Sequence, residues 1–210
     1  MYKQVLQSLL LYSMESQVLN KNLLKRLDGF HFKVLRQILG FHSSYYHKVV
    51  NASPAECSNE YIHREVHRRG FQVPTVTQLV SERRLKYFGH IWRHPNSTEH
   101  KVAFNDVMSF RKLRGNFRPG APRVHWPELC MVESSNRISH LATGFRPDTK
   151  YLSSPYYHTP DKNEIFSAMG PHLHNFYDTT QHVRSIRPFA SDRAQWKRVT
   201  GKKEPPSRRE

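Results

Sequence analysis

Apolar residues in the first half of the chain recur every three or four positions, a spacing typical of amphipathic helices. The clearest case is residues 19–39, where one continuous apolar stripe lies opposite a side rich in Lys and Arg. Asn20 or Asn22 is suited to cap the start of this helix, and Gly40 is suited to end it in a left-handed conformation. Gly29 lies inside the helix at a cost of ~1 kcal/mol relative to alanine, which suggests that a neighbour packs closely there.

Two more helices are predicted before the chain reaches His94. The first starts at Ser53, where serine, proline and glutamate form a capping box, and it ends at Gly70. The second follows Pro74 and Thr75, continues until Pro95 breaks it after His94, and places apolar and aromatic side chains along one side. Gly89 within it suggests tight packing against another helix. Amphipathic helices with short connections predict a small bundle.

The helical pattern weakens after the bundle. A short helix can run from Trp126 to about Leu141, and residues 144–163 show no clear periodicity. The fold class is therefore predicted to be mainly α, with a small bundle, an extended basic arm and a largely irregular C-terminal region with short helices. The expected segments are the bundle at 1–94, a linker and basic Pro/Gly arm at 95–126, an irregular region that can include a short helix at 127–189, a short helix at 190–200 and a disordered tail at 201–210.

Composition narrows the class of partner. The 210 residues include 33 Lys and Arg against 17 Asp and Glu, a formal charge of +16. Such a surplus attracts polyanions, so RNA and DNA are the expected partners. No apolar run approaches the ~20 residues that span a bilayer, so no membrane is expected. The 2 cysteines exclude a disulfide scaffold and fit an intracellular protein, nuclear or cytoplasmic.

Residues 82–123 contain the candidate nucleic-acid-binding surface, since Lys and Arg far outnumber acidic residues there. Arginine suits phosphate because its planar fork meets two oxygens at once. Pro119 and Pro122 stiffen the arm, which lowers the entropy lost on binding. The aromatic residues of the helix that follows Pro74 and Thr75 are expected in the core. The residues predicted to contact nucleic acid are Arg83, Arg84, Lys86 and Arg93 from the helix, and Arg111, Lys112, Arg114, Arg118, Arg123 and Trp126 from the arm.

Short segments follow one another in a characteristic order. They read YSMES at 12–16, L-x-x-F…LR-x-ILG at 27–40, RRLKYFGHIWR at 83–93, GAPRVHW at 120–126 and SDRAQWK at 191–197. In this order they resemble the C-terminal region of non-LTR (LINE-type) retrotransposon polyproteins, downstream of the reverse transcriptase palm. The chain departs from that pattern at Ser13, where the family has Gly, and at Ala121, where it has Arg. Residues 144–189 have no counterpart.

The resemblance implies a thumb and post-thumb region that holds template RNA, primer or target DNA beside a polymerase domain of the same polyprotein. The polymerase itself is not implied, because two-metal nucleotidyl transfer needs clustered carboxylates and no Y-x-D-D motif occurs in the sequence. The chain is therefore expected not to be an enzyme on its own and to need no cofactor. Contacts to the backbone alone predict RNA or DNA binding with little sequence specificity.

Other chemistries fit the sequence less well. A zinc site could draw on His158, His172, His174 and His182, but no cysteine lies near them, so no metal is expected. Pro160-Asp161 lacks the x-Lys that completes a nuclease P-D-(D/E)-x-K motif.

Two alternative functions stay open at the level of sequence. A basic helical module can bind an acidic protein, in which case its affinity for oligonucleotides should respond little to their length. A non-functional, translated retroelement remnant is the other interpretation, and it predicts a chain without cooperative melting.

Overall fold

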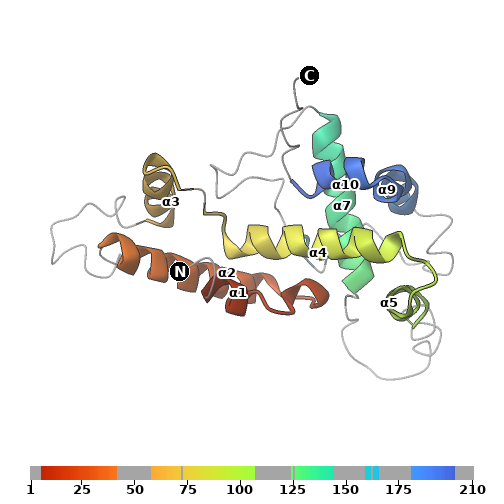
Figure 1. The fold of residues 1–210 in the computed structure, drawn as a ribbon, viewed down its shortest axis with the longest axis horizontal. Coiled ribbons are helices and arrows are strands. Elements are labelled where there is room, and N and C mark those ends of the chain that lie inside the picture. The colour runs from red at the N-terminus through yellow and green to blue at the C-terminus, as the bar shows by residue number, and fades with distance from the viewer. Residues whose placement is uncertain are drawn as a thin grey trace, which may run out of the picture. The chain divides into compact units, whose positions relative to one another are not determined.

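The computed structural model of the chain describes residues 6–41, 58–71, 73–106, 124, 126–143, 159–161, 163–165 and 181–201 (Figure 1). These residues form helices and include no strand, which confirms the mainly α fold class. None of the helices in these ranges is long and apolar enough to cross a membrane. The chain divides into two compact units: unit 1 is 1–18, 80–146 and 159–210, and unit 2 is 19–79 and 147–158.

Unit 2 contains α2 (Lys21–Leu39), α3 (Asn59–Arg68) and the first residues of α4 (Val76–Trp92). Asn20 caps α2, since its Oδ1 accepts a hydrogen bond from the Leu23 N–H at 2.7 Å. Gly40 ends the helix with φ of 74°, as the sequence predicted. Helices α2 and α3 contact each other, and their buried apolar residues are Leu24, Phe32, Leu35, Ile62 and Val66.

Two predictions for unit 2 are wrong. Helix α3 begins at Asn59 instead of Ser53, because Ser58 is extended and its Oγ caps the helix by accepting from the Tyr61 N–H at 3.0 Å. A helix running through position 58 is therefore excluded. Gly29 was expected to admit a close neighbour, yet a Cβ built there meets no atom within 4 Å. Gly70 follows α3 with φ of 81°, which confirms the predicted end.

Unit 1 is built around α7 (Trp126–Ala142), whose position confirms the helix predicted from Trp126. Helices α9 (Gln181–Ser191) and α10 (Arg193–Val199) lie beside α7 (Figure 1). The predicted C-terminal helix corresponds to α10. Unit 1 also contains α1 (Leu6–Leu10), the 3-10 helix η1 (Met14–Ser16), α5 (Thr98–His100) and the π-helix η3 (Lys101–Asp106).

Helix α9 lies where an irregular region was expected, so that part of the prediction is wrong. Pro188 within α9 argues against a helix from sequence, because proline removes a backbone donor. Burial outweighs this loss: Ile186 and Ala190, one turn apart, are both fully buried in the core of unit 1. The hydrophobic contact with α7 therefore holds α9 in place.

The aromatic residues of α4 lie in the core, as predicted. Phe88 is completely buried, and its ring lies 5.9 Å from the ring of Trp196 and 6.0 Å from that of Trp126. Gly89 is the point of closest approach, because a Cβ built there would overlap the Trp196 indole. The predicted tight packing at Gly89 is thus confirmed, with α10 as the neighbouring helix.

Candidate nucleic-acid interface

One face of α4, continued by the two residues that follow the helix, carries a row of basic and imidazole side chains. Lys86, His90, Arg93 and His94 are spaced i, i+4, i+7 and i+8, which places them on the same side of a helix. Lys86, His90 and His94 are exposed, and Arg93 is half-buried. Since the apolar residues of α4 point to the core, this face is free to meet a ligand.

Helix α10 presents a second row. Arg193, Lys197 and Thr200 are spaced i, i+4 and i+7, so they share one side, and both cations are exposed. Asp192 starts the helix, and its Oδ1 accepts hydrogen bonds from the N–H groups of Ala194 at 2.7 Å and Gln195 at 3.4 Å. The one acidic residue next to this row therefore serves as the helix cap.

Trp196 connects the two rows. Its side chain is only 3% exposed, and its Nε1 donates a hydrogen bond to the Leu85 carbonyl oxygen at 2.8 Å. The missing side chain at Gly89 lets the indole reach the α4 backbone. The spacing between α4 and α10 is therefore set by buried packing and does not depend on the charged side chains.

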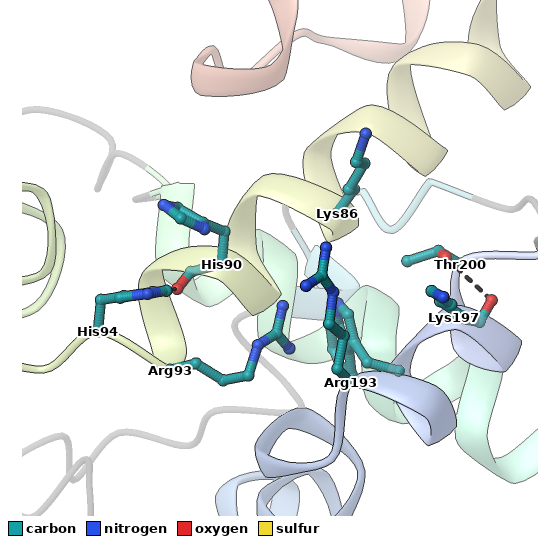
Figure 2. A pocket seen from close by; sticks show the side chains of 8 residues that line it. Lys86, His90, Arg93, His94, Arg193, Lys197 and Thr200 are labelled. Carbon is teal, nitrogen blue, oxygen red and sulfur yellow. Dashed lines mark hydrogen bonds between the residues drawn. The ribbon is translucent and has the colours of Figure 1, made fainter.

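The two rows enclose a groove with a volume of about 450 Å³ (Figure 2). Four permanent cations line it, and none of the described residues in its lining is acidic. This set, which we call the α4–α10 groove, consists of Lys86, His90, Arg93, His94, Arg193, Trp196, Lys197 and Thr200.

Arg93 is held in a fixed position within the groove. Its Nη1 donates a hydrogen bond to the Ala190 carbonyl oxygen at 2.9 Å. Burial, and next the charge of the neighbouring Arg193 guanidinium, lower the pKa of Arg93. The two guanidinium groups extend into the same space between α4 and α10 (Figure 2). Arginine keeps its charge even so, because its ordinary pKa lies above 12, and an anion between the two groups would relieve their repulsion.

The imidazole rings of the two histidines of the groove contact each other in a tilted arrangement. Their ring centroids lie 4.4 Å apart with an interplanar angle of 38°. The Nδ1 atom of His94 is 2.7 Å from the His90 carbonyl oxygen, so this nitrogen is the donor. The imidazole rings add polar atoms and an aromatic surface beside the cations.

The predicted site residues of α4 separate into three groups. Lys86 and Arg93 line the groove. Arg83 is exposed but does not line it, and its Nη1 approaches the Leu11 carbonyl oxygen at 3.5 Å. Arg84 is completely buried, so its predicted placement on an exposed basic face is wrong.

The position of Arg84 is explained by an interior ion pair. Its Nη1 lies 3.2 Å from Oε2 of Glu133 on α7, and Arg137 lies 3.6 Å from the other oxygen of the same carboxylate. Ser81 donates to Glu133 and accepts from Arg137. Glu133 is therefore the shared counter-ion of two buried arginines, and Arg84 is excluded from the proposed interface.

Trp126 is engaged inside unit 1. Its Nε1 donates to the Glu15 carbonyl oxygen at 2.6 Å, and its ring lies 5.7 Å from that of Tyr87. These contacts anchor the start of α7 to the N-terminal segment. The other predicted arm residues lie outside the described residues: Arg111, Lys112, Arg114, Arg118 and Arg123.

Six residues of the groove were not among the predicted contacts: His90, His94, Arg193, Trp196, Lys197 and Thr200. The i, i+4 spacing of the two cations on α10 was visible in the sequence. What could not be seen was that α10 packs on α4, a contact between segments more than one hundred positions apart.

Two further chemical features of the described ranges are the buried thiol of Cys130 and possible metal ligands. Burial raises the pKa of the Cys130 thiol well above its usual range, so the thiol stays protonated and is a poor nucleophile. No three His, Cys, Asp or Glu side chains within those ranges are arranged to hold a metal ion. The histidines considered for zinc at 158, 172 and 174 fall outside the described residues.

No protein-family model, curated protein sequence or solved structure shows significant similarity to this chain.

Proposed function

We propose that unit 1 binds the phosphate backbone of RNA or DNA through the α4–α10 groove. The observation that carries this proposal is the convergence of Lys86, Arg93, Arg193 and Lys197 on one concave surface, without an acidic side chain among the described lining residues. Cations that already have acidic partners gain little from a phosphate. These four have no acidic partner in the lining. Their binding to phosphates would release the counter-ions of the nucleic acid and would also reduce the repulsion among the four cations.

The groove is preorganised for this purpose. Trp196, Gly89 and the Arg93–Ala190 hydrogen bond fix its floor and one of its arginines before any ligand arrives. Less conformational entropy is then lost on binding. The side chains present charge and not a pattern of base-specific donors and acceptors, so the interface should bind many sequences with similar affinity.

We further propose that the chain is the thumb and post-thumb part of a non-LTR retrotransposon polyprotein. Segments that resemble that family meet in the core of unit 1: Trp126 bonds to Glu15, and Trp196 bonds to Leu85. Ser13 adds support, because it has φ of 59°, a conformation that favours the glycine found there in the family. Catalysis would then reside in a separate polymerase domain.

The proposal is tested by measuring the affinity of the full chain for a single strand of about 20 nucleotides, long enough to exceed a typical site. Arg193→Ser/Lys197→Ser removes two exposed cations of the groove. Lys25→Ser/Lys33→Ser removes two exposed cations of α2 in unit 2 and is the charge-matched control. We expect the groove variant to lose about tenfold or more in affinity, and the control to lose much less. Equal losses would contradict a localised site.

A second candidate function rests on the exposed side of α2. Leu23, Phe30 and Ile38 are 38%, 49% and 59% exposed, and they follow one another at helical spacing. Lys25 and Lys33 are exposed on the same helix. Apolar groups beside cations match an amphipathic helix with acidic flanks, one of the recurring ways in which proteins bind each other. Phe30→Ser should abolish binding of such a peptide and leave strand binding by the groove unchanged.

A further inference from the structure

The positive charge of the α4–α10 groove exceeds the negative charge of a single internal phosphate of a nucleic-acid backbone. An internal phosphodiester has a single negative charge, whereas four permanent cations converge here. A terminal phosphate monoester carries about −1.5 to −2 near neutral pH and offers three strong acceptor oxygens. The monoester and the diester that follows it would together balance most of the groove's charge.

The shape of the groove also favours a chain end. A volume of about 450 Å³ falls within the range of pockets that enclose a small ligand. Surfaces that track single strands are instead long channels with successive stacking positions. A compact pocket with a buried tryptophan as its floor is better suited to receive one terminal group than to follow a strand.

The arginine pair gives the site a defined centre. Arg93 directly follows α4 and is held by the Ala190 carbonyl, whereas Arg193 comes from the start of α10. Each guanidinium can donate to a different oxygen of one phosphate, because both extend into the same space (Figure 2). Lys86 and Lys197 complete the lining from the two helices, and the His90–His94 pair offers a ring face for the terminal base.

We propose that the α4–α10 groove is a receptor for the terminal phosphate monoester of a nucleic-acid strand, with Arg93 and Arg193 bridged by the phosphate. This inference rests on the proposed function and makes it more specific. The chemistry of the site is shared by 5′ and 3′ phosphates, so the experiment separates them. No bond is formed or broken in this step, since the groove only holds the end.

The test compares strands of identical sequence that differ only at their ends, bound to the full chain at constant ionic strength. One carries a 5′ phosphate, one a 3′ phosphate, one has hydroxyl groups at both ends, and one is circular. We expect one phosphorylated strand to bind about tenfold more tightly than the hydroxyl-ended and circular strands, as one or two additional charge-assisted hydrogen bonds allow. The preferred end is identified by which phosphate gives the gain.

The ratio of affinities for the phosphorylated and the hydroxyl-ended strand should fall to about one in the double variant Arg193→Ser/Lys197→Ser, whose two replaced side chains are exposed. The control Lys25→Ser/Lys33→Ser should keep the wild-type ratio. Inorganic pyrophosphate, added at constant ionic strength, should displace the phosphorylated strand and remove its advantage in affinity over the hydroxyl-ended strand. Equal affinity of the wild type for phosphorylated, hydroxyl-ended and circular strands would overturn the inference. If the groove variant still weakened all four strands in that case, backbone binding would stand. If the variant matched the wild type on every strand, the proposed function would fail as well.

Discussion

Two arginines nine positions apart, Arg84 on α4 and Arg93 directly after its last residue, have opposite surroundings. Arg84 points into unit 1 and lies 3.2 Å from Glu133, which also serves Arg137. Arg93 points into the α4–α10 groove, where its charged neighbour is Arg193. The buried cluster contains its own anion, whereas none of the described residues lining the groove supplies one.

The difference shows that the position of the carboxylates separates the two kinds of arginine. An arginine beside a buried carboxylate stabilises the fold, whereas an arginine in a lining without a carboxylate is available to an external anion. A buried arginine without an acid is costly, so Glu133 is required inside the fold. A solvated arginine needs no such partner and keeps its capacity for an external anion.

The largest effect is expected from Glu133→Gln. The change removes the carboxylate that Arg84 and Arg137 share in the interior. Breaking a buried pair in this way typically costs about 3–5 kcal/mol of unfolding free energy. Denaturant unfolding monitored by circular dichroism measures the loss. The exposed Glu99→Gln is the matched control in unit 1 and should change stability by less than about 0.5 kcal/mol.

His31 in unit 2 is a buried histidine whose neighbour, His63, is also a histidine. Burial, and then repulsion from His63, lower the pKa of His31 to about 4 from its ordinary 6.5. The unfolded chain therefore binds more protons between these values, so stability is present above pH 6.5 and is lost as pH falls toward 4. The loss amounts to at most about 3 kcal/mol.

Melting of the wild type should accordingly shift to lower temperature between neutral pH and pH 5. His31→Leu should flatten this dependence, because leucine takes up no proton. An unchanged pH dependence in the variant would show that other groups cause the acid sensitivity of unit 2.

Gly89→Ala tests the close contact between α4 and the Trp196 indole, which lies between the groove and the core of unit 1. The added methyl group would overlap the Trp196 indole, so the helices must move apart. Overpacking of this kind typically costs about 1–3 kcal/mol, and strand binding should weaken with it. Gly29→Ala is the matched control, since its Cβ would meet no atom within 4 Å. That change should stabilise the chain by about 0.5–1 kcal/mol.

The smallest effect on stability is expected for Arg193→Ser/Lys197→Ser. Both side chains are exposed, so the unfolding free energy should change by no more than about 0.5 kcal/mol. Any change should be in the stabilising direction, because repulsion on Arg93 is removed. Thermal melting beside the wild type measures it. A loss as large as that of Glu133→Gln would mean that the groove is part of the core.

Local patterns in the sequence were sufficient for much of the fold. The cap at Asn20, the glycine ends at Gly40 and Gly70, and the helix beginning at Trp126 all follow from short-range chemistry. Helix α9 was missed because Pro188 weakens the local signal and only contact with α7 outweighs it. Burial against a distant segment cannot be predicted from a short stretch of sequence.

For the same reason, the sequence predicted only part of the candidate site. Lys86 and Arg93 could be selected from sequence because they belong to a basic helix. Arg84 could not be separated from them, since its partner Glu133 lies 49 positions away. Arg193 and Lys197 join the groove only through the packing of Trp196 on α4.

The central claim is that phosphates bind in the α4–α10 groove, and the salt dependence of strand binding tests it most directly. Each lost phosphate contact lowers the slope of log K against log salt by ~0.7 on single strands. Arg193→Ser/Lys197→Ser should therefore reduce the slope by roughly 1.4, while Lys25→Ser/Lys33→Ser leaves it near the wild-type value. A groove variant with the wild-type slope and affinity would contradict the account.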